Sequence, residues 1–169
     1  MSIHDVIKWR IAEGRLHRLP MLVTWNPLVR AMLVTPAILS LLQGPWSDEI
    51  NEARAGVLHA DLEAFIAGNS VTHQHLKRLS PARDQCWEIR SVRDDPSIRV
   101  LGGFIERDVF VAINYAKRED LGGWKDRRWR DFKETCKTEW SNLFHPYLRA
   151  QSITIHDVVT GAIDGKYFY

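Results

Sequence analysis

The sequence predicts an α+β fold in which a small antiparallel β-meander packs against helices. Three apolar runs between residues 86 and 115 alternate in the manner of strands and are separated by short polar turns. Two longer stretches, residues 47–68 and 124–143, place their apolar residues at helical spacing instead. A chain of 169 residues, 45% hydrophobic and 26% charged, can bury a core without disulfides or metals.

Residues 1–45 are expected to form an N-terminal helical extension, and residues 46–169 the α+β domain, in one compact unit. Ser2 can cap the first helix, because Asp5 stands three residues further on as in a capping box. A proline is tolerated in the first turn of a helix, so an apolar run behind a proline can be helical. The elements expected in the extension are a helix over residues 2–13, a short strand over residues 19–27, and two short helices that Pro27 and Pro36 begin.

The α+β domain is expected to begin with its best-defined helix. Ser47 or Asp48 can cap this helix, and Gly68 ends it. The pair Gly102-Gly103 interrupts the second strand and predicts a bulge or a close backbone approach. The expected strands are residues 86–92, 98–105 and 109–115, and the end of the chain is expected as a strand or short helix with an aromatic tail.

The stretch over residues 124–143 is expected to be a long, strongly charged helix. Its apolar residues share one face, and basic residues surround that face. Rings mixed with cations also occur on nucleic-acid-binding surfaces, but stacking needs exposed rings, and a single apolar stripe favours a core role. The stripe consists of Trp129, Phe132, Cys136, Trp140 and Leu143.

Composition favours a cytoplasmic protein without cofactors. The net charge is only +2, so an anionic partner would need a local cluster of basic residues. Cys86 and Cys136 are expected to be reduced, buried thiols. No metal-ligand set, phosphate-binding glycine loop or nucleophile motif is evident, and neither a secretory signal nor a long enough apolar span is found.

Arginines interrupt the strands of the predicted meander. Arg90 and Arg99 stand among residues that look half-buried, in the first and second strands. A guanidinium suits a phosphate because its planar fork can hold two oxygens and stays charged. The alternative is a surface ion pair of Arg90 with Glu88, Asp94 or Asp95, worth about 1 kcal/mol or less. Both interpretations remain open from the sequence.

The meander resembles the small ribonuclease toxins of the RelE/ParE superfamily, most closely the HigB or phage Gp49-like branch. That group shows a Trp/Tyr-Glu-Leu/Ile-Arg strand, an Arg-Val strand and a third strand that ends in a basic segment. The resemblance spans about a third of the chain, residues 57–118. The matching residues are Trp87, Glu88, Ile89, Arg90, Ile98, Arg99, Val100, Tyr115, Lys117 and Arg118.

The resemblance implies an RNA-binding protein, and a metal-independent endoribonuclease that an antitoxin neutralises. Such cleavage uses the 2′-hydroxyl as nucleophile and needs a base, an acid and cations for the developing charge. Arg90 and Arg99 would be the cationic clamp, and Tyr115 and Lys117 would transfer protons. Arg118 would bind RNA beside them. Arg127 and Arg128, which lie outside the resemblance among the basic residues around the helical stripe, are expected to bind RNA as well. The alternative is a non-catalytic, phage-derived accessory protein on the same fold, whose arginines are structural.

Overall fold

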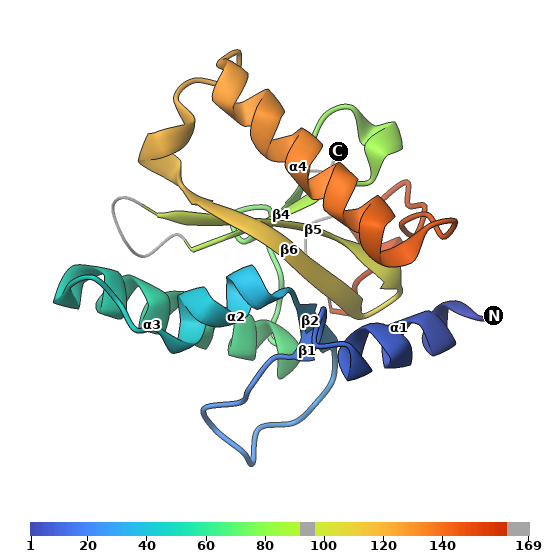
Figure 1. The fold of residues 1–169 in the computed structure, drawn as a ribbon, viewed down its shortest axis with the longest axis horizontal. Coiled ribbons are helices and arrows are strands. Elements are labelled where there is room, and N and C mark those ends of the chain that lie inside the picture. Colours follow the sequence, from blue (N-terminus) through green and yellow to red (C-terminus); the bar gives the residue numbers. More distant parts are fainter. Residues whose placement is uncertain (92–96, 162–169) are drawn as a thin grey trace.

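A computed structural model of the chain describes residues 1–91 and 97–161. Within them a mixed sheet of six strands lies between helices, so the α+β fold is confirmed (Figure 1). The helices are α1 (Ile3–Ala12), α2 (Pro36–Gln43), α3 (Glu49–Ile66) and α4 (Arg127–Phe144). The strands are β1 (His17–Arg18), β2 (Ala31–Val34), β3 (Leu76–Arg78), β4 (Trp87–Arg90), β5 (Ile98–Glu106) and β6 (Val109–Lys117).

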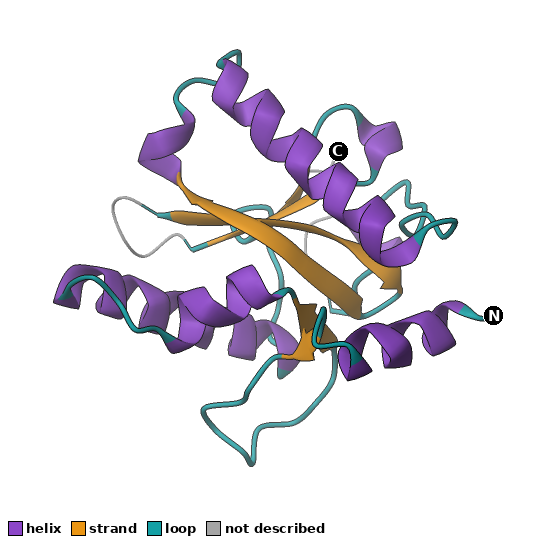
Figure 2. Cartoon of the chain, in the orientation of Figure 1, coloured by secondary structure: helices purple, strands orange, loops and turns teal. Residues whose placement is uncertain are grey.

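The sheet has the strand order β1-β2-β6-β5-β4-β3. The predicted antiparallel meander is confirmed as β4–β5–β6 (Figure 2). Every other pair is antiparallel as well, except that β2 runs parallel to β6. The three additional strands extend the meander at both edges, so the first 45 residues contribute two strands to the same sheet.

Helices cover both faces of the sheet and create two buried clusters. On one face α2 and α3 enclose the apolar residues that include Trp87, Val100 and Phe110. On the other face α4 packs on residues that include Leu101 and Val111. The alternation of side chains along each strand divides the residues between these clusters. We call the two faces the α3 side and the α4 side.

Local sequence signals explain most helix boundaries. Ser2 and Asp5 form the predicted capping box of α1, and Asp48 caps α3. The predicted apolar stripe of α4 is confirmed as buried, although the helix begins later than expected, at Arg127 after the cap Asp126. Trp124 consequently lies outside the helix. Cys86 and Cys136 are free and buried, with their sulfur atoms 3.9 Å apart.

Two predictions for the N-terminal region are wrong. The run over residues 19–27 is a loop and not a strand, because the buried carboxylate of Glu63 accepts hydrogen bonds from the backbone N–H groups of Leu22 and Val23. Pro27 does not begin a helix, because Ala31–Val34 pairs with Val109–Ala112 and is buried in the sheet. Tertiary pairing overrides local preference at both places. The helix after Pro36 is confirmed.

Candidate functional site

Two arginines share one buried glutamate on adjacent strands. Glu88 is fully buried, and its Oε1 lies 3.1 Å from Nε of Arg90 and 2.9 Å from Nε of Arg99. Arg90 also donates from Nη2 to Oε2 of Glu88, at 3.3 Å. Arg90 lies opposite Arg99 in the β4–β5 ladder, and Glu88 precedes Arg90 by two residues, so strand geometry brings all three together. The expected pair of Arg90 with Glu88 therefore exists, but it is buried and shared with Arg99.

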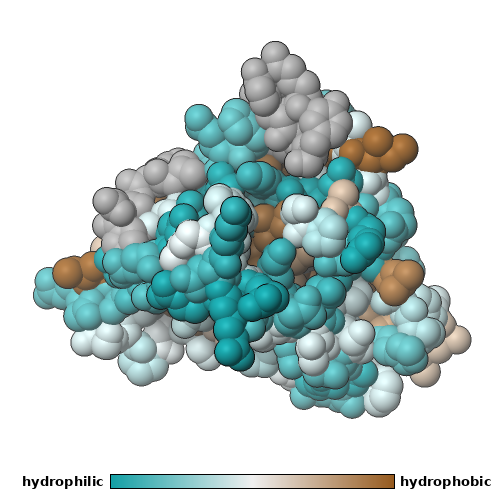
Figure 3. All heavy atoms as spheres, turned by 90° about the horizontal axis from the view of Figure 1, so that it is seen from above, coloured by the Kyte–Doolittle hydropathy of each residue, from teal (hydrophilic) through white to brown (hydrophobic). Residues whose placement is uncertain are grey.

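Two further cations belong to this group. Lys77 of β3 lies opposite Glu88, so its side chain is on the same side of the sheet. Arg118, which begins the 3-10 turn Arg118–Leu121, contributes its positive charge to the surroundings of Arg99. We call Lys77, Arg90, Arg99 and Arg118 the basic cluster. The cluster lies on the α4 side, a face that is mostly hydrophilic (Figure 3).

Positive charge exceeds negative charge within this group of described residues. Burial lowers the pKa of the Arg99 guanidinium, Glu88 opposes that shift, and the like charges of Arg90 and Arg118 add to it. The side chains of Arg90 and Arg99 are 20% and 13% exposed, so water screens this repulsion only in part. An anion beside the two guanidinium groups would relieve it.

The arginines also retain hydrogen-bond donors. Nε of Arg90 and both Nε and Nη1 of Arg99 are buried and donate no hydrogen bond to any residue that the structure describes. Both Nε atoms form ion pairs with Glu88 without hydrogen-bond geometry, because Glu88 Oε1 accepts no well-directed hydrogen bond from the described residues. These three nitrogen atoms are shielded from solvent, so an oxyanion would meet the partly exposed remainder of the two guanidinium groups.

Aromatic rings border the basic cluster. Nζ of Lys77 lies 5.0 Å from the ring centre of Trp124, and Trp124 stacks on Trp129 at 4.5 Å with an angle of 20°. The guanidinium of Arg118 lies 5.8 Å from the ring centre of Trp129. Trp129 is buried, as expected for the helix stripe, but Trp124 is 56% exposed. The expectation of a core role therefore applies to Trp129 and not to Trp124.

Tyr115 and Lys117 lie on the opposite face from the two arginines. Tyr115 pairs with Val100 and Lys117 with Ile98, and both partners belong to the core on the α3 side. Arg99 pairs with Ala116, one residue out of phase with them. Because successive side chains of a strand point to opposite faces, the sheet separates this pair from Arg90 and Arg99.

Arg127 and Arg128 are engaged at the start of α4. Nε of Arg127 lies 3.3 Å from the carboxylate of Asp131, and Nη2 of Arg128 lies 2.9 Å from that of Asp126. The hydrogen bonds from Arg128 lower the pKa of Asp126 to about 2. Both arginines are exposed, and each has an acidic partner within its own helix or cap, so much of their charge is already balanced there.

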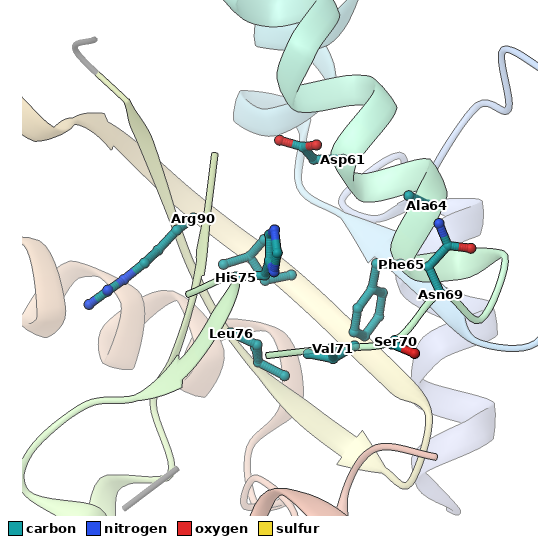
Figure 4. A pocket seen from close by; sticks show the side chains of 10 residues that line it. Asp61, Ala64, Phe65, Asn69, Ser70, Val71, His75, Leu76 and Arg90 are labelled. Atoms are coloured by element: carbon teal, nitrogen blue, oxygen red, sulfur yellow. The ribbon is translucent and has the colours of Figure 1, made fainter. Parts of the chain in front are cut away.

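A cavity of about 210 Å³ lies on the α3 side, between α3 and the strands β3 and β4. Asp61 and Phe65 of α3 and His75 are among the residues that line it (Figure 4). Arg90 also borders this cavity, but its side chain points away from it. The cavity and the basic cluster are therefore separate features on opposite faces.

Comparison with known proteins finds no relative: no protein-family model, no curated protein and no solved structure matches this chain. Within residues 1–91 and 97–161, every helix is too short or too polar to cross a lipid bilayer. The same residues include no group of three or more histidine, cysteine, aspartate or glutamate side chains placed to hold a metal ion.

Sequence reasoning identified Arg90, Arg99 and Arg118 but missed Lys77 and the exposed position of Trp124. The signal for Lys77 was weak, because β3 has only three residues. Asp94 and Asp95, the other acids considered for Arg90, lie outside the described residues.

Proposed function

We propose that the protein binds RNA through the basic cluster. The observation that carries the proposal is the pair Arg90 and Arg99, which share the single charge of Glu88 while their side chains stay 20% and 13% exposed. Two guanidinium groups that share one carboxylate retain positive charge for a phosphate, which offers several acceptor oxygens to planar N–H forks. The resemblance to RelE/ParE toxins supports RNA as the source of that phosphate.

The geometry supports RNA binding better than cleavage. A phosphate held by Arg90 and Arg99 on the α4 side is out of reach of Tyr115 and Lys117, whose side chains lie on the α3 side. Proton transfer requires hydrogen-bond distance or one intervening water. The proposal is therefore a binding protein of the toxin type, in which these two residues have no role in chemistry.

Salt-dependent binding tests the proposal. A fluorescently labelled oligouridylate of about eight nucleotides, a common site size for single strands, would be titrated at several salt concentrations. Replacing Lys77→Gln is expected to weaken binding and to reduce the slope of log affinity against log salt by about 0.7, the value for one lost phosphate contact on a single strand. Lys77 is the best first position because the ion pairs of Glu88 within the described residues are with Arg90 and Arg99, so this change leaves them intact.

The matched control is Lys8→Gln, the same change at an exposed position of α1. The control should leave both the affinity and the salt slope unchanged. Equal losses at Lys77 and Lys8 would show diffuse attraction to a weakly basic protein and would overturn the proposed site. No binding by the wild type at low salt would overturn the proposed function altogether.

A second candidate is a binding surface for a protein partner, such as the antitoxin that the resemblance implies. The loop over residues 19–30 exposes large apolar side chains, including Trp25 at 85% and Leu28 at 75%. The hydrogen bonds to Glu63 hold the backbone of this loop in one conformation, so its exposed apolar side chains have defined positions on the surface. Large exposed apolar patches on a soluble protein often mark interaction sites.

Co-expression with the product of the neighbouring reading frame tests this second candidate. The double change Trp25→Ser with Leu28→Ser should prevent a stable complex, whereas Trp124→Ser should not. A complex that survives the double change would exclude this loop as the interface. Growth arrest on expression of the chain alone, relieved by co-expression, would support the toxin role.

A further inference from the structure

We propose that the outer face of the Trp124 indole, opposite Trp129, is a stacking platform for one base of single-stranded RNA, next to the backbone that the basic cluster holds. This inference rests on the proposed RNA binding and names the form of RNA. Trp124 lies between the 3-10 turn Arg118–Leu121 and α4, and it is more than half exposed. A large exposed ring beside half-buried cations is the combination that single-strand binding sites use.

The ring of Trp124 is held in place from one side. Trp129, buried in the core, stacks under it with ring centres 4.5 Å apart and nearly parallel planes. A ring fixed in this way loses little further freedom when a ligand stacks on it, which reduces the cost of binding.

A movable lysine side chain lies over the other face. Rings stacked at 4.5 Å leave no room for an ammonium group between them, so Lys77 Nζ, 5.0 Å from the Trp124 ring centre, lies over the outer face. A lysine ammonium at an exposed ring changes an equilibrium constant roughly 2- to 5-fold, whereas a stacked base changes the affinity roughly 5- to 150-fold. A base is therefore expected to displace the ammonium, which stays close enough to meet a phosphate.

Cations flank the platform on both sides. Arg118 lies over the ring of Trp129, and its Nη1 donates to the carbonyl oxygen of Gly122 at 2.7 Å, which fixes the guanidinium near the platform. Lys77 lies on the other side. A duplex cannot use this arrangement, because its base faces are already stacked on each other. The favoured ligand is thus a single strand whose bases are free to splay out.

The test compares two oligonucleotides of equal length and charge. One is a labelled single-stranded oligouridylate, and the other is an abasic strand with the same phosphodiester backbone. Trp124→Ala is expected to weaken binding of oligouridylate roughly 5- to 150-fold and to leave binding of the abasic strand unchanged. Trp124→Phe should restore part of the affinity, because a smaller ring still stacks.

Three controls make the result specific. Trp25→Ala removes an even more exposed tryptophan far from the basic cluster and should change neither affinity. An RNA duplex formed by two fully complementary strands, which has no loop, should bind the wild type and Trp124→Ala equally. An oligodeoxyuridylate tests whether Trp124 distinguishes RNA from DNA. If Trp124→Ala weakens binding of the RNA and DNA strands by a similar factor, Trp124 contributes base stacking, and other residues distinguish ribose from deoxyribose.

The possible failures are distinguishable. If the wild type binds neither strand, the proposed function fails together with this inference. If the wild type binds both strands and Trp124→Ala binds oligouridylate equally well, the platform is overturned while RNA binding stands. Equal losses of both strands on Trp124→Ala, with a lowered unfolding temperature, would assign Trp124 a structural role over Trp129 and also overturn the platform.

Discussion

Replacing Glu88→Gln keeps the shape of the side chain and removes its charge. The carboxylate is fully buried and within about 3 Å of two guanidinium nitrogen atoms, at 3.1 Å from Arg90 and 2.9 Å from Arg99. After the replacement two like charges face each other with no neutralising partner among the described residues. An amide oxygen can still accept one hydrogen bond, but it cannot balance a charge.

The expected loss of stability is large for one isosteric change. Removing one partner of a fully buried ion pair costs about 3–5 kcal/mol. Arg90 and Arg99 keep some contact with water, being 20% and 13% exposed, and this relieves part of the cost. We therefore expect Glu88→Gln to lower the free energy of unfolding by about 2–3 kcal/mol, which for a chain of this length lowers the unfolding temperature by about 5–10 °C.

Urea unfolding at neutral pH, followed by tryptophan fluorescence, measures this difference. The matched control is Asp131→Asn, which removes the partner of the exposed Arg127 and should cost about 0.5 kcal/mol or less. An effect of Glu88→Gln as small as that of the control would refute the reasoning, because it would mean that the two arginines need no buried counter-charge. In buffer without urea, Glu88→Gln should bind oligouridylate more tightly than the wild type, because the net charge at the site is more positive by one.

Two further changes test the backbone and the helix start. Gly102→Ala should destabilise the protein by about 3 kcal/mol, because the added methyl would lie 1.9 Å from the carbonyl oxygen of Val111 at the β-bulge; Gly123→Ala, which meets nothing within 4 Å, is its control in the same urea assay. The pKa of Asp126 is lowered to about 2 in the folded state, so the ionised carboxylate stabilises the fold at every pH above the ordinary carboxyl pKa. This contribution to stability is lost as the pH falls from about 4 to 2. Asp126→Asn should therefore flatten that part of the stability–pH curve, and a curve identical to that of the wild type would contradict the assignment.

Local patterns in the sequence predicted the elements whose signals are local. The capping box at Ser2, the core stripe of α4 and the three strands of the meander were all predicted and are all present. The parallel strand β2 was not predicted, because an apolar run as short as Ala31–Val34 has the same appearance in a helix and in a buried strand. Only its distant partner β6 decides between them.

The candidate site was predictable in part for a related reason. Arg90 and Arg99 were expected to act together because the resemblance implies that both belong to a cationic clamp. The assignment of Tyr115 and Lys117 to the same centre required the register between β5 and β6, where a shift of one residue exchanges the two faces. Trp124 was expected to begin the long helix, because the periodic pattern does not reveal that the cap at Asp126 comes after it.

The parallel pairing of β2 with β6 constrains the order in which the chain can fold during synthesis. Residue 31 pairs with residue 109, so the first strands leave the ribosome long before their partner exists. Until β6 is complete, Met32, Leu33 and Val34 have no sheet to enter, and such exposed apolar segments favour association between chains. The N-terminal segment therefore depends on the C-terminal half for its structure, and a fragment that ends before β6 is expected to aggregate or to be degraded by proteases.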